Sequence, residues 1–156
     1  MGYLRVLLAI DPGKEHFGYA VFSDTLLTAC GTPEHADPNA LASIAIRLYD
    51  YYRRQPETRV TVAMEVPQNY LRARRIKSLE GLVALCAAVD EAVQVGRFYQ
   101  PKMWKGQVPK PAHHRRLARV LTGVELDLWA TADHNAKDAI GIGLFHLGRT
   151  KRGGIV

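Results

Sequence analysis

The chain has 156 residues, a length that suits one domain with a sizeable core. Hydrophobic residues make up 47% and charged residues 23%, and no apolar run approaches the roughly 20 residues of a membrane span. The two cysteines, Cys30 and Cys86, are isolated, which argues against a disulfide framework or a C-x-x-C zinc site. Because the sequence MGYLRV lacks the apolar stretch of a secretory signal, we expect a cytoplasmic protein without a membrane partner.

In chain order, patterning predicts strands at 4–10, 17–22 and 25–31, a helix at 39–54, a strand at 58–66, a helix at 79–95, a short strand at 96–99, and helices at 111–121 and 133–148. Asp37 or Asn39 is the expected cap of the first helix, and Ser78 starts the second. We expect a single domain at 1–150 and a disordered tail at 151–156. Strands followed by alternating helices and strands predict an α/β fold, a mixed sheet with helices on its faces.

Basic residues are concentrated in the middle of the chain. The net charge is +6, yet residues 70–119 alone carry eleven Lys and Arg against three acids. This distribution is expected if one surface meets a polyanion such as nucleic acid, although a solvated basic face would give the same pattern. The candidate contacts of this kind are Arg72, Arg74, Arg75, Lys77, Lys102, Lys105, Lys110 and Arg115.

Three acids stand at the margins of apolar elements. Asp11 ends the run Leu7–Ile10, Glu65 ends the fourth predicted strand, and Asp138 lies within the apolar last helix. Each alone could be a turn, edge or cap carboxylate. Together they would repel strongly, and a divalent cation is the usual remedy. Carboxylates beside a basic surface therefore suggest a metal-dependent nuclease, in which two cations activate water and stabilise the leaving oxygen.

Four segments make the chain resemble RuvC-type Holliday junction resolvases. They are "AIDPGKEHFGYAVF", "VAMEVP", "FYQPKMWKGQVPKPAHHRRLARVL" and "HNAKDAIGIGLFHLG", in that order. The resemblance implies a ribonuclease H-like fold with a mixed five-stranded sheet, a homodimer, and incision of branched DNA such as a four-way junction. It also implies two Mg²⁺ or Mn²⁺ ions per site, held by Asp11, Glu65 and Asp138. The broadly apolar helix 79–95 is a candidate dimer interface, or else an internal helix. No sequence feature specifies a branch-migration partner.

The sequence departs from the family pattern at one metal-site position. Many members carry an acid three residues before the last one, where this chain has Asn135, preceded by His134. Both precede Asp138 at helical spacing, so either can share its face and contribute to the site. Asn135 would offer a neutral oxygen, whereas His134 would offer a nitrogen or handle a proton. Asp133 is better explained as a helix cap.

Aromatic and histidine residues near the acids have two interpretations each. Tyr70 could stack on an unpaired base at the branch point or lie in the core, and Trp104 could stack or anchor a loop. His113 and His114 sit among arginines and are expected on the DNA-facing or solvated side rather than on a metal.

Two further functions remain open. A ribonuclease of the same fold would cut RNA or a hybrid, and a non-catalytic junction-binding protein would account for the missing fourth carboxylate. A phosphotransfer enzyme of the actin-like superfamily would need two domains, for which this chain is too short.

Overall fold

The computed structural model describes residues 2–13, 16–34, 38–77 and 80–156. Their elements are β1 (Leu4–Asp11), β2 (Gly18–Ser23), β3 (Leu26–Gly31), α1 (Pro38–Arg53), β4 (Thr58–Glu65), α2 (Tyr70–Arg75), α3 (Gly81–Val93), β5 (Arg97–Tyr99), α4 (Pro101–Trp104), α5 (Lys110–Ala118), α6 (Val124–Thr131), α7 (His134–His146) and a 3₁₀ turn, η1 (Arg152–Gly154). No helix among these residues is long and apolar enough to cross a bilayer.

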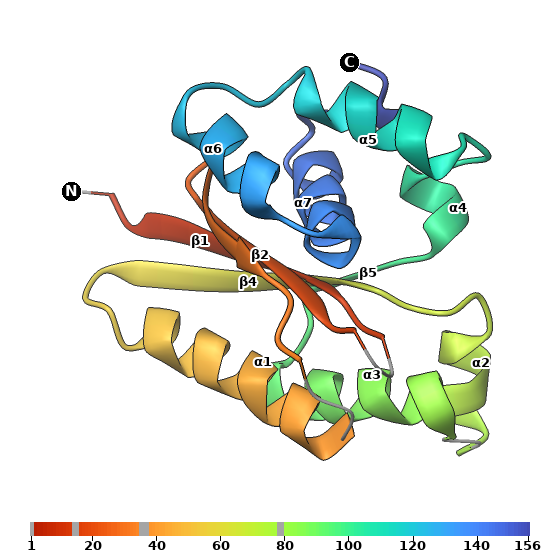
Figure 1. Ribbon diagram of the computed structural model, residues 1–156. Helices are drawn as coiled ribbons and strands as arrows, with labels where there is room; N and C mark the ends of the chain where they lie inside the picture. The colour runs from red at the N-terminus through yellow and green to blue at the C-terminus, as the bar shows by residue number, and fades with distance from the viewer. Residues whose placement is uncertain (1, 14–15, 35–37, 78–79) are drawn as a thin grey trace.

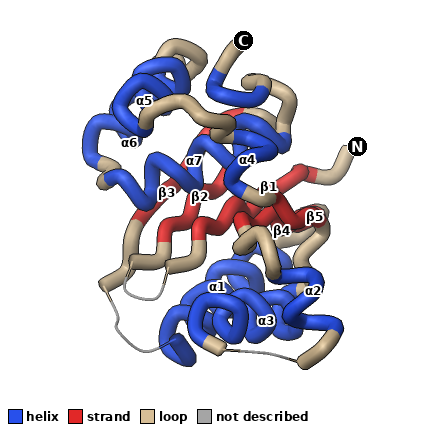
Figure 2. Tube along the Cα trace, turned by 90° about the vertical axis from the view of Figure 1, so that its right-hand side faces the viewer, coloured by secondary structure: helices blue, strands red, loops and turns tan. Residues whose placement is uncertain are grey.

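The five strands form one mixed sheet in the order β3-β2-β1-β4-β5. The first three strands make an antiparallel meander, whereas β4 and β5 run parallel to β1. Helices cover both faces, with α1, α2 and α3 on one side and α4 to α7 on the other (Figure 1). The same three layers are seen from the side in Figure 2. The predicted α/β class with a mixed five-stranded sheet is confirmed.

Strand β1 is buried on both faces, and its side chains alternate between two cores. Val6, Leu8 and Ile10 belong to the core beneath α1 and α3. Leu7 and Ala9 belong to the core beneath α7. The same period of two in β4 places Met64 in the first core and Ala63 in the second, so the next odd-numbered residue of each strand is directed towards α7.

Three short helices, α2, α4 and α6, were not expected from the sequence, because none has a long amphipathic period. The proposed caps Asp37 and Ser78, with Leu79, lie outside the described residues. The apolar residues of α3, including Leu85 and Val89, pack in the core shared with α1. Of the two interpretations of the helix predicted at 79–95, a dimer interface or an internal helix, this packing corresponds to the internal helix.

Within the tail at 151–156, residues Arg152–Gly154 form the 3₁₀ turn η1. Gly153 and Gly154 are buried, and the guanidinium of Arg116 donates to the Gly153 carbonyl oxygen at 3.0 Å. Without side chains, these two glycines fit closely beneath α5, a contact that composition alone does not indicate.

Candidate active site at the carboxyl ends of two parallel strands

Asp11 and Glu65 end adjacent parallel strands. The register pairs Ile10 with Met64, so the two acids follow at the same level, and the alternation described above directs both towards α7. Parallel strands lie about 4.8 Å apart, which brings like carboxylates within strong electrostatic range. The strand ends therefore concentrate negative charge at one point.

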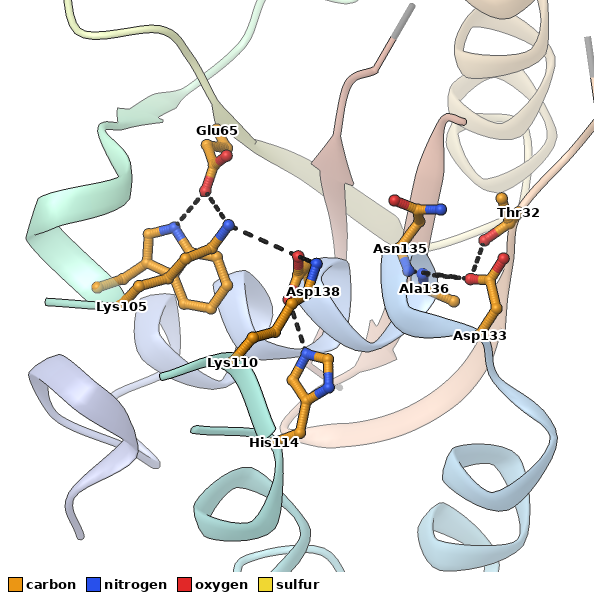
Figure 3. Close-up of polar contacts among 10 residues, drawn as sticks. Thr32, Glu65, Lys105, Lys110, His114, Asp133, Asn135, Ala136 and Asp138 are labelled. Carbon is orange, nitrogen blue, oxygen red and sulfur yellow. Dashed lines mark hydrogen bonds and ion pairs between the residues drawn. The ribbon is translucent and has the colours of Figure 1, made fainter. Parts of the chain in front are cut away.

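Helix α7 brings the third acid, Asp138, into the same place. Asp133 caps this helix, as predicted, by accepting from the backbone amides of Asn135 and Ala136 at 3.0 and 2.9 Å. Thr32 donates to the same carboxylate oxygen (Figure 3). Gly18, the β2 partner of Asp11, leaves no room for a side chain, since a Cβ would lie 2.2 Å from the Asn135 carbonyl oxygen. This close approach brings the start of α7 against the strand that pairs with β1.

Two lysines and a histidine bind the acids (Figure 3). The Lys105 ammonium lies 3.2 Å from Glu65 Oε2 and 3.6 Å from Asp138 Oδ2. Lys110 Nζ lies 2.8 Å from Asp138 Oδ2, and His114 Nε2 lies 2.8 Å from Asp138 Oδ1. All three side chains come from the segment FYQPKMWKGQVPKPAHHRRLARVL quoted above.

The pKa values of Asp138 and Asp11 are shifted in opposite directions. Burial alone would raise the pKa of Asp138, but the His114 hydrogen bond and the nearby lysines lower it to about 2. The pKa of Asp11 is raised well above its ordinary value, first by burial and then by repulsion from Glu65. Among the described residues, no hydrogen bond or ion pair reaches the Asp11 carboxylate. Asp11 is therefore the acid with the greatest demand for a cation.

The donor set fits a hard divalent cation by its chemistry, because carboxylate oxygens are the ligands that Mg²⁺ and Mn²⁺ prefer. Within the described residues, no three His, Cys, Asp or Glu side chains already have the spacing of a metal cage. In this arrangement the ammonium groups of Lys105 and Lys110 supply the positive charge that pairs with the carboxylates of Glu65 and Asp138.

Asn135 and His134 are not joined to the acids by any contact among the described residues. His134 is exposed at the start of α7, and Asn135 is half-buried beside β2. Their contribution to a metal site stays a prediction.

Tyr70 and Trp104 are core residues, which contradicts their assignment to DNA. Tyr70 has no exposed surface and packs against Phe98, because α2 turns this ring inward beneath the sheet. Trp104 is 1% exposed and its indole donates to Glu65 Oε2 at 2.7 Å, so it anchors α4 to β4. Neither ring can stack on a base while these contacts persist.

The expected position is wrong for His113. His113 is buried against Trp104, with ring centroids 5.2 Å apart, and His114 contacts Asp138 as described above. His114 follows Lys110 by four residues, so helical spacing could have placed it on the same face of α5 as that lysine.

The remaining basic candidates are exposed near this end of the sheet. Arg72, Arg75 and Lys77 project from α2 and the turn after it, and Arg74 pairs with Asp90 of α3 at 2.8 Å. Lys102 and Arg115 are exposed on α4 and α5. Helices α2 and α4 lie on opposite faces of the sheet at the same end (Figure 1).

Comparison with solved structures decides the fold. RuvC of T. thermophilus in complex with a Holliday junction substrate superposes with a TM-score of 0.61 and 19% identity, covering 91% of this chain and 92% of that one. The chain has a RuvC-like fold. A second Thermus thermophilus RuvC structure gives a TM-score of 0.56 and 21% identity over 90% of this chain and 92% of that one.

No family model and no curated protein matches the sequence. The RuvC-like fold, of the ribonuclease H type, is thus shown by structural similarity, at 19% and 21% sequence identity. The chemistry of the site has to follow from this chain's own residues.

Proposed function

We propose that this protein is a metal-dependent endonuclease that cuts Holliday junctions or related branched DNA. The observation that carries the proposal is the convergence of Asp11, Glu65 and Asp138 from β1, β4 and α7 on a RuvC-like fold. A structural role explains this convergence poorly, because burial and repulsion from Glu65 and Asp138 raise the pKa of Asp11 well above its ordinary value, although Lys105 and Lys110 act to lower it.

The three carboxylates would hold two Mg²⁺ or Mn²⁺ ions, with Asn135 or His134 contributing at the fourth position. Such cations, when bound, activate a water molecule and stabilise the leaving oxygen of a phosphodiester. Trp104 holds Glu65 in place through its indole N–H, and His114 fixes one oxygen of Asp138. Lys105 and Lys110 lie where their ammonium groups can turn from the carboxylates to a DNA phosphate.

The exposed basic side chains of α2, α4 and α5 would neutralise phosphates on the arms of the junction. Symmetric nicks in two opposed strands need two active sites related by a two-fold axis, so we propose a homodimer as the active species. A RuvC in the comparison above was solved with a Holliday junction, which makes a four-way junction the first substrate to test.

The test is a cleavage panel of a four-way junction, a flap, a fork and a DNA:RNA hybrid, with Mg²⁺ or Mn²⁺ and with products mapped on all strands. We expect paired, symmetric nicks in the junction. Asp11→Asn should bind the junction with unchanged affinity and lose nicking, whereas Asp127→Asn, an exposed acid on α6, should cut normally.

Three results would contradict the proposal. Full cleavage by the Asp11→Asn protein would remove the acids from the chemistry. Preferential cutting of the hybrid would favour a ribonuclease, and retention of junctions without nicking by either metal would indicate a binding protein.

A further inference from the structure

The C-terminal turn η1 packs behind the segment that supplies the active-site lysines. Gly154 lies against His113 and Arg116 of α5, and Gly153 lies against Val108 in the preceding loop. The Arg116 guanidinium donates to the Gly153 carbonyl oxygen at 3.0 Å. Figure 1 shows this end of the chain beside α5, on the side of the sheet that carries α7.

Two short paths of contacts lead from this turn to the acids. Along the first, His113 packs on the Trp104 ring, and Trp104 donates to Glu65. Along the second, α5 itself carries Lys110 and His114, which both bind Asp138. The position of α5 therefore sets the contacts of two of the three carboxylates.

We propose that Arg152–Gly154 form a positioning element for the active site. The turn holds the 105–116 segment in the position from which Lys105, Lys110 and His114 reach Glu65 and Asp138. No residue of the turn touches the acids, so its effect passes through α4 and α5. The consequence for catalysis rests on the nuclease function proposed above.

Glycine is required at the contact for two reasons. Gly154 has φ +73°, and a Cβ there would lie 2.9 Å from the Arg116 Cβ, an atom close to the backbone of α5 that cannot swing away. Gly148 offers a matched control. Its φ is +71°, but a Cβ would meet nothing within 4 Å. Alanine therefore strains the backbone equally at both positions and displaces α5 at only one.

The experiment compares Gly154→Ala and Gly148→Ala in the full chain by amide hydrogen exchange and by junction nicking. We expect Tm to fall in both variants, and to fall further in Gly154→Ala, because only its Cβ meets Arg116. In Gly154→Ala alone, exchange within residues 105–116 should accelerate about tenfold, because the local opening of that segment becomes easier. Its kcat should fall about tenfold or more, with KM changed less than about twofold, since misplaced groups impair the reaction more than binding.

Equal exchange in the 105–116 segment of the two variants would overturn the proposal, as would equal kcat values where the unaltered protein nicks the junction. If Gly154→Ala does not fold, Arg116→Lys keeps the charge but shortens the reach to Gly153, and faster exchange in the same segment is again required. Because exchange needs no activity, it decides the positioning role even if the unaltered protein nicks no DNA, a result that would refute only the nuclease function.

Discussion

The buried acid Glu125 should contribute strongly to stability in a manner that depends on pH. It lies on α6 and is 3% exposed. Its carboxylate accepts from both Nη atoms of Arg149, at 2.6 and 2.9 Å, and from the backbone amides of Leu27 and Thr122. Replacing it by glutamine, Glu125→Gln, leaves an amide NH₂ facing donors, so at least one hydrogen bond is lost.

The size of the effect follows from the pKa of Glu125. Burial alone would raise this pKa, but Arg149 and the backbone amides lower it from 4.5 to about 2. At 1.36 kcal/mol per pKa unit, the difference corresponds to about 3 kcal/mol in favour of the folded protein. Because the folded pKa is the lower one, this contribution is present above about pH 4.5 and is lost as the pH falls towards 2.

Urea unfolding followed by circular dichroism at about pH 7 and about pH 3 tests this reasoning. Glu125→Gln should lower the free energy of unfolding by about 3 kcal/mol at neutral pH and by clearly less in acid. The exposed acid Asp127 on the same helix is the control, and Asp127→Asn should change stability by less than about 0.5 kcal/mol. A difference between Glu125→Gln and the unaltered protein that is the same at both pH values would refute the reasoning.

Three further predictions concern the active site and its surroundings. Asp11→Asn should raise Tm by about 3 °C or more at neutral pH, because burial raises the pKa of Asp11 and its carboxylate therefore destabilises the folded protein. Calorimetry should show that this gain in Tm vanishes in acid, where Asp11 is protonated in both the folded and the unfolded protein. Tyr70→Phe should leave junction affinity within about twofold and should not destabilise the protein, since its buried hydroxyl lacks a well-oriented partner among the described residues; a large loss in a gel-shift assay would restore the stacking hypothesis. Arg72→Met and Arg75→Met should each lower the slope of log junction affinity against log salt concentration by about one. Arg74→Met should lower this slope by less, because Arg74 is already paired with an acid of α3. Equal slopes for all three variants would contradict the assignment of Arg72 and Arg75 to DNA contacts.

The sequence by itself determined the sheet and the ends of its central strands. The apolar run Leu7–Ile10, a matching run before Glu65 and the Asp133 cap all depend on patterns within about ten residues, which are visible in one dimension. These patterns were sufficient to place Asp11 and Glu65 at the ends of strands.

Only the tertiary structure decided what surrounds the acids. Trp104 meets Glu65 across 39 residues, and His114 meets Asp138 across 24, after α4 and α5 have folded back over the sheet. Helices this short have weak periodicity, so their inward faces are set by what they pack against rather than by their own sequence. For the same reason the burial of Tyr70 and the docking of the 152–154 turn could not be predicted, because each depends on packing against residues distant in the chain.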